Sequence, residues 1–316
     1  MRAAILQEPG RFAIEDRPVP EPASGEILVK TGVCGVCTGD VDQFSGRVKG
    51  LEFPRFLGHE VSGTVVAAGP DVRDFKEGDR VVLYSEGRGY AEYVVVPARW
   101  AVKLDDETPL HLALGEPIAC SVNGVRKADP QLNDSVCLVG CGFMGLIMLQ
   151  VFRARGAGRR IAVDRREGAL ELARSLGATH TINPESEDPV DAVHSLTNGR
   201  GVDIGVEAAG NQATLDLTSR LVRMEGKLEV FGFHLGGTRI VDWAHWNWMA
   251  FQIINGHTRS AGIYVEGIRI GIGLLEAGKL DMQPLVTHRY ALDEINDGFR
   301  AAAAKNGNFV KAVIDF

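Results

Sequence analysis

Residues 135–145 read SVCLVGCGFMG, and this stretch decides the fold of the second part of the chain. The short apolar run from Ser135 to Val139 is typical of a strand that is buried on both faces. Three glycines follow it, and residues 143–155 then have the pattern of a helix that stops at Gly156. A strand, a glycine-rich turn and a helix in this order indicate a dinucleotide-binding βαβ unit.

The three glycines have different expected roles. Gly140 would make the tight turn, and Gly142 would let a pyrophosphate approach the backbone at the helix N-terminus. Gly145 would let the helix and the strand pack closely. Phe143 and Met144, which lie between the last two glycines, are included among the expected cofactor-binding residues.

The choice of cofactor depends on the residues that follow the next expected strand, Arg160 to Asp164. A carboxylate at Asp164 would accept hydrogen bonds from the ribose hydroxyls of the adenosine half and repel a 2′-phosphate. Arg165 and Arg166 follow immediately, and arginines at this place can hold a 2′-phosphate. Because Asp164 itself opposes NADP, we expect NAD to be favoured over NADP.

The rest of the chain divides into two regions with different patterns of expected secondary structure. The first third carries short alternating segments, which indicate a small and strongly curved β domain, at Glu26 to Val33 and at Val61 to Ala67. From about Ser121, strands and helices alternate, which predicts a parallel, doubly wound α/β sheet. The further expected elements are strands at Val202–Glu207 and Lys227–Phe231, a helix around Leu215–Met224, and a tail with a helix at Leu292–Ala304 and a strand at Phe309–Ile314.

Composition excludes several classes of protein. A length of 316 residues fits two domains, and a net charge of −7 disfavours nucleic acid and acidic membranes as partners. Five cysteines form an odd, sparse set, which argues for a reducing cytoplasm rather than a disulfide framework. No export signal is visible, and the apolar run Phe143 to Phe152 is too short to span a bilayer.

Residues suited to chemistry lie outside the α/β region. They are Cys37 in GVCGVCTGD, the pair His59-Glu60 in FLGHE, and Glu116 in GEPIAC. A thiolate, an imidazole and a carboxylate suit zinc and leave one position open for a substrate. Their spacing alone does not define a site, because they lie far apart in the chain. Cys34 and Cys37 could also be a redox pair, although no thioredoxin-like pattern surrounds them.

Over essentially its whole length, the chain resembles the medium-chain, zinc-containing alcohol dehydrogenases of the sorbitol and threonine dehydrogenase type. The motifs that carry the resemblance are GVCGVCTGD, GHEVSGTVVAAGPDVRDFKEGDRV, YAEYVVVPARWAVKL, EPIAC, the glycine fingerprint and LVTHRYALDEINDGF. The resemblance implies a GroES-like, β-rich catalytic domain over 1–122 and 262–316. It also implies a Rossmann dinucleotide-binding domain over 123–261.

By the same resemblance, Cys37 and His59 would be zinc ligands and Glu116 would be the third. Cys120, in the same short segment, is the competing third ligand. Glu60 resembles the family glutamate that lies behind the metal and can enter its coordination sphere.

Three further roles follow from the resemblance. Asp40 would hydrogen-bond the ligand histidine and fix its ring orientation. Lys311 resembles a basic residue that reaches the pyrophosphate, with an exposed edge-strand lysine as the alternative. Gly210 would lie where the fourth strand passes the nicotinamide ribose.

The chain departs from the family at three places. No cysteine lies between Tyr84 and Tyr90, so a second, structural zinc is not expected. The residues that usually relay the alcohol proton are replaced, which leaves Thr38, Asp42, Glu60 or water as candidates. The aromatic stretch from Asp242 to Met249 is expected in core or dimer packing, although its His245 could face the substrate.

The expected activity is zinc-dependent hydride transfer between a secondary alcohol, such as a polyol or cyclitol, and NAD(P). The alternatives are a zinc-free quinone or enoyl reductase that uses NADPH, and a non-catalytic nucleotide-binding protein on the same fold. The expected partners are a small-molecule alcohol and further copies of the chain in a homo-oligomer, a dimer or tetramer.

Overall fold

The computed structural model describes residues 1–316, and the chain folds as two compact units. The first unit comprises Met1–Ala119, Arg259–Gly278 and Met282–Phe316. The second comprises Cys120–Thr258 and Lys279–Asp281. The sequence predicted a first domain over 1–122 and 262–316 and a second over 123–261. Both of these predicted boundaries lie three residues later in the chain than the boundaries at 119/120 and 258/259. Each unit has its own hydrophobic core, as expected for a chain of this length.

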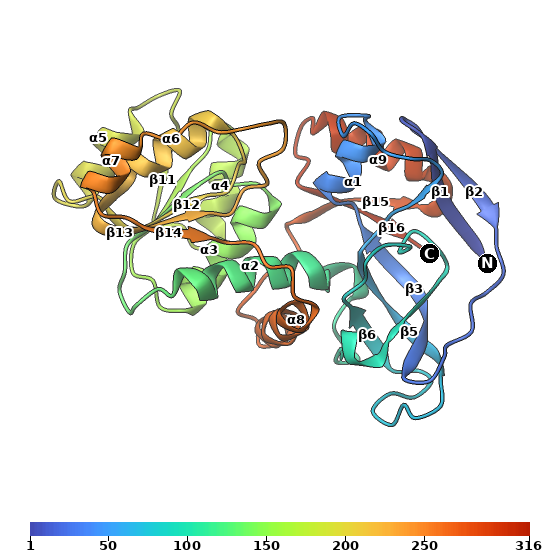
Figure 1. The fold of residues 1–316 in the computed structure, drawn as a ribbon. Coiled ribbons are helices and arrows are strands. Elements are labelled where there is room, and N and C mark those ends of the chain that lie inside the picture. Colours follow the sequence, from blue (N-terminus) through green and yellow to red (C-terminus); the bar gives the residue numbers. More distant parts are fainter. The chain divides into compact units, whose positions relative to one another are not determined.

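The first unit is built from two mainly antiparallel sheets (Figure 1). A three-stranded sheet has the order β2-β1-β4, and a seven-stranded sheet has the order β15-β16-β3-β5-β6-β8 with β7 paired to β3. Its strands are β1 (Arg2–Glu8), β2 (Arg11–Asp16), β3 (Glu26–Gly35), β4 (Arg55–Phe56), β5 (Glu60–Ala68), β6 (Arg80–Leu83), β7 (Tyr93–Pro97), β8 (Ala101–Lys103), β15 (Val286–Ala291) and β16 (Lys311–Asp315). Its helices are α1 (Thr38–Phe44), α8 (Ala261–Glu276) and α9 (Ile295–Ala304), and α2 (Gly115–Ala128) begins in it.

An aromatic cluster holds α1 and α9 against the sheets of this unit. The ring centroid of Phe299 lies 4.7 Å from that of Phe12 and 5.1 Å from that of Phe44. Tyr90 packs edge-on against Phe299 at 5.5 Å and is almost fully buried. Such contacts add to the stability that burial of the rings supplies. The cluster therefore holds α1 through Phe44, its last residue, and the helix begins directly after Cys37.

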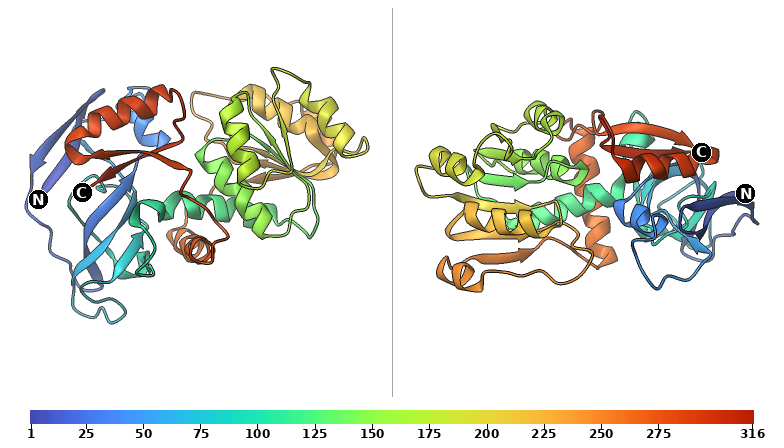
Figure 2. Two further views of the ribbon diagram at one scale, coloured as in Figure 1. Left: turned by 180° about the vertical axis from the view of Figure 1, so that it is seen from behind. Right: turned by 90° about the horizontal axis from the view of Figure 1, so that it is seen from above.

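The second unit is a doubly wound parallel sheet with helices on both faces (Figure 2). Its strand order is β11-β10-β9-β12-β13-β14, and neighbouring strands pair in parallel throughout. Its strands are β9 (Val136–Val139), β10 (Arg160–Val163), β11 (His180–Ile182), β12 (Val202–Glu207), β13 (Val222–Val230) and β14 (Gln252–Asn255). Its helices are α3 (Phe143–Ala154), α4 (Glu167–Ser175), α5 (Pro189–Leu196), α6 (Gln212–Leu221) and α7 (Trp243–Trp248).

One expected element is wrong at its end. The helix expected around Leu215–Met224 ends at Leu221, and β13 begins at the next residue rather than at Lys227. The reason is long-range pairing: Val222 pairs with Val202 across the sheet, and the register then shifts before Lys227 pairs with Ile204. A bulge of this kind leaves no local sequence pattern that separates it from a helix end.

The expected tail elements are present with small differences. The expected helix Leu292–Ala304 is a short 3-10 turn followed by α9, and the terminal strand begins at Lys311 rather than Phe309. None of the helices combines the length and apolar character that crossing a lipid bilayer requires.

A buried carboxyl group without a partner lies on β13. The side chain of Glu229 is fully buried, and neither of its oxygens has a hydrogen-bond partner. Two glycines leave room for it, because a Cβ at Gly124 or Gly256 would lie 3.0 Å or 2.8 Å from Oε1. Burial raises the pKa of Glu229 to about 8. The group is therefore a protonated acid at neutral pH in the folded protein.

This gives a pH-dependent cost to folding. Unfolded, Glu229 loses its proton near pH 4.5, so above that pH folding must take up a proton, and the cost grows until the folded group ionises near pH 8. We expect Glu229→Gln to raise the free energy of unfolding relative to the wild type by about 3 kcal/mol more at pH 8 than at pH 5. Urea unfolding at both pH values measures this. The exposed Glu225 on the same strand is the control, since Glu225→Gln should leave the pH dependence unchanged. An equal effect of Glu229→Gln at both pH values would contradict the prediction.

Candidate active site and cofactor site

The register of the large sheet brings distant segments to one end of the first unit. Gly35, the last residue of β3, pairs with Glu60, the first residue of β5. Gly35 also pairs with Val313 of β16, a strand that begins at Lys311. Cys37 follows two residues after the end of β3 and caps α1. The sheet therefore collects a thiol, a carboxylate and an ammonium group from three parts of the sequence.

These groups form a compact cluster with metal-ligand chemistry. One ligand atom each of Cys37, His59 and Glu60 lies within 4.8 Å of the others. Lys311 Nζ lies 2.7 Å from both carboxylate oxygens of Glu60 and donates a hydrogen bond to Oε1. Glu60 Oε2 is buried and accepts no hydrogen bond. Apart from the ammonium group of Lys311, this oxygen is open to a second cation such as a metal ion.

A carboxylate faces one ring nitrogen of the histidine in the cluster. His59 Nδ1 lies 3.5 Å from Asp40 Oδ2, which leaves Nε2 for a metal ion. Asp40 Oδ2 also accepts a hydrogen bond from the backbone N–H of Gly58 at 3.3 Å. Tyr90 Oη lies 3.1 Å from the same oxygen and 3.0 Å from the carbonyl oxygen of Gly35, and its single proton can go to either. Asp40 therefore lies beside the imidazole of His59, and its role of orienting a ligand histidine stays a prediction.

The charges around the cluster show why a cation fits there. Burial by itself lowers the pKa of His59, but the negative charges of Cys37 and Asp40 raise it well above its usual value. Burial also lowers the pKa of Lys311, and the charges of Glu60 and Cys37 outweigh that effect and raise it. The negative groups therefore favour a positive charge on both His59 and Lys311. A divalent cation bound by thiolate, imidazole and carboxylate would supply positive charge at the same place, as zinc does.

The expected third ligand and its competitor lie on α2. Glu116 is in the first turn of that helix, and its charge raises the pKa of both His59 and Lys311. It therefore belongs to the same electrostatic neighbourhood as the cluster. Cys120 follows one turn later on the same helix and is partly exposed. The choice between these two as third ligand stays a prediction.

Lys311 is placed differently from both sequence-based alternatives. It was expected either to reach the pyrophosphate or to be an exposed edge-strand lysine. Its side chain is buried, with 6% exposed, and its ammonium group pairs with Glu60. β16 is also an inner strand, hydrogen-bonded to β15 and β3. The exposed alternative is wrong, and a contact with the pyrophosphate stays a prediction.

The candidates for proton relay differ in their surroundings. Thr38 is exposed at the start of α1, immediately after Cys37. Asp42 is nearly buried, and its Oδ1 accepts a hydrogen bond from Arg47 Nε at 2.6 Å. Cys34, the other half of the possible redox pair, is fully buried in the hydrophobic core, where burial raises the pKa of its thiol. All five cysteines are free thiols.

In the second unit, the fingerprint glycines follow β9. Gly140 has φ of +109°, a conformation that side chains other than glycine rarely adopt. A Cβ at Gly145 would lie 2.2 Å from the carbonyl oxygen of Gly140, so only glycine lets α3 and the turn pack this closely. A Cβ at Gly142 would meet no atom within 4 Å. The chain thus leaves open space at Gly142, at the N-terminus of α3, where the pyrophosphate is expected.

The acidic residue after β10 is held by its neighbour. Asp164 accepts hydrogen bonds from Arg166 through both carboxylate oxygens, at 3.0 Å from Nε and 2.9 Å from Nη2. Asp164 Oδ2 also accepts one from the backbone N–H of Cys141 at 2.9 Å, which ties it to the glycine turn. Although burial raises it, these hydrogen bonds lower the pKa of Asp164 below its ordinary value. Arg165 is exposed and lies 3.8 Å from Glu185.

The aromatic stretch is divided between core and surface. Trp246 is buried in the core of the second unit, whereas Trp243 and Trp248 are 60% and 77% exposed. His245 Nε2 lies 3.3 Å from the carbonyl oxygen of Ser219. Gly210 follows β12 with φ of +80°, and a Cβ there would lie 2.7 Å from the carbonyl oxygen of Phe233.

Sequence reasoning missed several residues that build these sites. Neither Tyr90 behind Asp40 nor the Lys311–Glu60 ion pair was expected. Gly35 offered a faint signal, because a glycine inside an expected strand marks a close approach. Pairs that are 50 and 251 residues apart follow only from strand register.

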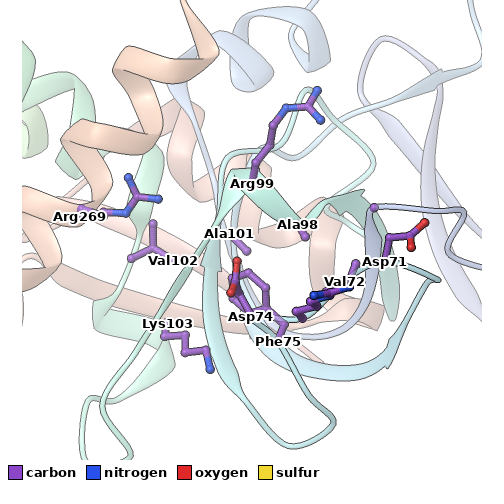
Figure 3. A pocket seen from close by; sticks show the side chains of 12 residues that line it. Asp71, Val72, Asp74, Phe75, Ala98, Arg99, Ala101, Val102, Lys103 and Arg269 are labelled. Atoms are coloured by element: carbon purple, nitrogen blue, oxygen red, sulfur yellow. The ribbon is translucent and has the colours of Figure 1, made fainter.

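A separate surface pocket lies in the first unit, next to β8 (Figure 3). Its lining carries both acids and bases, among them Asp71, Asp74, Arg99, Lys103 and Arg269. It contains no cysteine or histidine and shares no residue with the Cys37 cluster. This pocket therefore lacks groups for metal-assisted hydride transfer.

Comparison with known proteins agrees with this geometry. Residues 23–106 match the alcohol dehydrogenase GroES-like domain, and residues 144–265 match the zinc-binding dehydrogenase family. The first match covers Cys37, His59 and Glu60. The second covers the strand and helix units that follow the glycine turn.

Relatives match over nearly the whole length of the chain. The chain is 30% identical to an uncharacterized zinc-type alcohol dehydrogenase-like protein of Escherichia coli, over 98% of this chain and 97% of the relative. It is 29% identical to sorbitol dehydrogenase of Bacillus subtilis, over 99% and 97%. A putative zinc-binding dehydrogenase of Sinorhizobium meliloti, solved bound to NADP, is 26% identical with a TM-score of 0.90, covering 100% of this chain and 99% of that one. The chain belongs to the zinc-type, medium-chain alcohol dehydrogenase family, and its reaction is NAD(P)-dependent alcohol oxidoreduction.

The packing of Gly35 against Glu60 gives a direct test of the cluster. A Cβ at Gly35 would lie 1.9 Å from Glu60 Oε2, so Gly35→Ala must displace the carboxylate. We expect this variant to lose most of its bound zinc and its alcohol oxidation, with metal content measured by mass spectrometry after dialysis. Gly273→Ala is the control, since a Cβ at that helix position in the same unit meets nothing within 4 Å. Full zinc occupancy in Gly35→Ala would show that Glu60 is not part of the metal site.

Proposed function

We propose that this chain oxidises a secondary alcohol with several hydroxyl groups, such as a polyol or cyclitol, with a single catalytic zinc ion. The observation that carries the proposal is the Cys37, His59 and Glu60 cluster, with ligand atoms within 4.8 Å of one another. The lean to a polyol rests on the carboxylates near the metal position and on the likeness to sorbitol dehydrogenase. A single zinc is proposed because no cysteine lies between Tyr84 and Tyr90.

Each residue of the cluster has a proposed role. Cys37, His59 and Glu116 would hold the zinc, and Glu60 would stand beside it as an additional carboxylate. Bound zinc would act as a Lewis acid that lowers the pKa of the alcohol substrate. Asp40 keeps the imidazole of His59 in one orientation, from 3.5 Å.

The residues that move the alcohol proton are less constrained. We propose Thr38 ahead of Asp42, because Thr38 has an exposed side chain beside Cys37. The carboxylate of Asp42 is instead paired with Arg47. Glu60 and water stay alternatives, and Glu60 would have to release Lys311 to take part.

We also propose that NAD is preferred over NADP. Support comes from Asp164, whose carboxylate stands at the end of β10 and is tied to the glycine turn through Cys141. A negative charge there opposes a 2′-phosphate. The bidentate contact with Arg166 also keeps that guanidinium occupied.

We propose a cytoplasmic homo-oligomer. The five free cysteines support a reducing compartment. An oligomer is supported by β14, an edge strand on which Ile253 is 46% exposed, and by the 77% exposed Trp248 nearby in sequence. Unpaired edges and exposed aromatic rings are features that subunit contacts commonly cover.

The experiment that tests the function is a panel of alcohols and polyols assayed with NAD and NADP, with zinc measured on the same sample. We expect activity with at least one polyol and about one zinc ion per chain. His59→Ala should abolish activity and lose zinc while NADH binding is retained, because the cofactor fingerprint lies in the other unit. His180→Gln, on β11 of that other unit, is the control. Activity that survives in His59→Ala would rule out the proposed metal site.

The cofactor preference has its own test. In Asp164→Asn the negative charge is lost and the hold on Arg166 is weakened, so this guanidinium can turn to a 2′-phosphate. We expect the ratio of kcat/KM for NAD to that for NADP to fall by about tenfold, since one charge contact is worth roughly 1.5 kcal/mol. Steady-state kinetics with both cofactors measure the ratio. An unchanged ratio would show that Asp164 does not determine the preference between NAD and NADP.

A further inference from the structure

The strand order of the second unit indicates where the two halves of a dinucleotide lie. The order β11-β10-β9-β12-β13-β14 reverses direction between β9 and β12. A dinucleotide binds across this point, at the carboxyl ends of the strands. With the proposed adenosine site at Asp164 after β10, the nicotinamide half extends to the ends of β12 and β13. The inference below rests on this proposed cofactor site.

A single buried carboxylate organises the end of β12. Glu207, the last residue of the strand, is fully buried. Its Oε1 accepts hydrogen bonds from the backbone N–H groups of Ala209 at 2.9 Å and Gly210 at 2.7 Å, and from Thr214 Oγ1 at 2.7 Å. Its Oε2 lies 2.8 Å from His234 Nε2, in the loop after β13. One side chain thus ties two loops together.

The protonation of the histidine follows from its partners. Arg239 Nε donates to His234 Nδ1 at 3.1 Å, and because a guanidinium only donates, Nδ1 must be the acceptor. The ring proton is therefore on Nε2, from which it is donated to Glu207. The arginine, the neutral imidazole and the carboxylate form a chain in which each donor has its acceptor, so the buried charge of Glu207 is compensated.

Arg239 also closes the loop that carries His234. Its Nη2 donates to the carbonyl oxygens of Leu235 at 2.9 Å and Gly210 at 3.4 Å. Between Leu235 and Arg239 the chain passes two glycines with positive φ. Glycines leave the backbone conformationally free, so side-chain hydrogen bonds must hold this loop. The guanidinium group of Arg239 thereby connects the loop after β12, through Gly210, to the loop after β13, through His234 and Leu235.

We propose that Glu207, His234 and Arg239 form an anchor that positions the loops under the nicotinamide half of the cofactor. They are positioning residues, because they act on the cofactor through Gly210 and the loop backbone. The anchor would hold those loops ready for the nicotinamide, so that binding does not have to order them.

The test compares a whole cofactor with one of its halves. In His234→Ala we expect NADH to bind about tenfold more weakly, measured by its fluorescence, and the KM for NAD to rise by a similar factor. Binding of 5′-AMP, measured by calorimetry, should be unchanged, because AMP occupies only the β9–β10 half. His234→Gln, whose amide can donate to Glu207, should restore most of the NADH affinity. If His234 served only the general stability of the fold, its loss would weaken the binding of NADH and of AMP to the same extent.

The chain offers a matched control on the same strand. Asp203, at the other end of β12, accepts hydrogen bonds from Ser135 and from Arg223 Nε at 2.7 Å. Arg223→Ala therefore removes an arginine from a carboxylate network at the opposite end of the same strand. We expect Arg239→Ala to weaken NADH binding and Arg223→Ala to leave it unchanged, even where both lower the melting temperature.

The outcomes distinguish the anchor from the cofactor site itself. Unchanged NADH binding in both His234→Ala and Arg239→Ala would overturn the anchor alone, and so would an equal loss of NADH and AMP affinity. If the wild-type protein binds neither NADH nor NADPH, the proposed cofactor site is wrong, and the anchor falls with it.

Discussion

The structure of the first unit depends on the burial of a carboxylate beside a thiol and an imidazole. Glu60 has 2% of its side chain exposed, and its only cationic contact is Lys311. A buried ion pair is stable only when geometry is good and the remaining lone pairs are used. Glu60 Oε2 accepts no hydrogen bond, and the ammonium group of Lys311 lies 2.7 Å from it. A metal ion at the proposed site beside Cys37 and His59 would give this oxygen a second partner.

The register of the sheet determines where this carboxylate lies. A shift of one residue between β3 and β5 would turn Glu60 to the other face, because side chains alternate along a strand. The pairings Gly35 with Glu60 and Gly35 with Val313 fix both neighbours of β3 at once. Gly35 is needed at this crossing because any side chain would occupy the position of the carboxylate. The aromatic cluster around Phe299 holds α1, and with it Cys37, at the same end.

The sequence predicted these features to different depths. The strand, glycine turn and helix at residues 135–155 follow from local patterns, and the structure has them nearly as expected. Cys37, His59 and Asp40 were identified through resemblance, since no spacing rule joins residues from separate strands. Tyr90 behind Asp40, Lys311 beside Glu60 and the end of α6 at Leu221 depend on register between distant strands. Periodicity reports which face of an element is apolar, and it carries no information about which residue stands opposite.

Two glutamates on neighbouring strands show what burial alone says about function. Glu207 on β12 and Glu229 on β13 are both fully buried. Glu207 accepts four hydrogen bonds, including one from a histidine that an arginine polarises. Glu229 accepts none, and burial raises its pKa to about 8. The first side chain compensates its desolvation by joining two loops at the carboxyl edge of the sheet, where a cofactor binds. The side chain of Glu229 instead packs against Gly124 and Gly256. It avoids part of the desolvation cost by staying neutral. Burial of a carboxyl group is thus common to both, and what sets Glu207 apart is that its partners come from the two loops it joins.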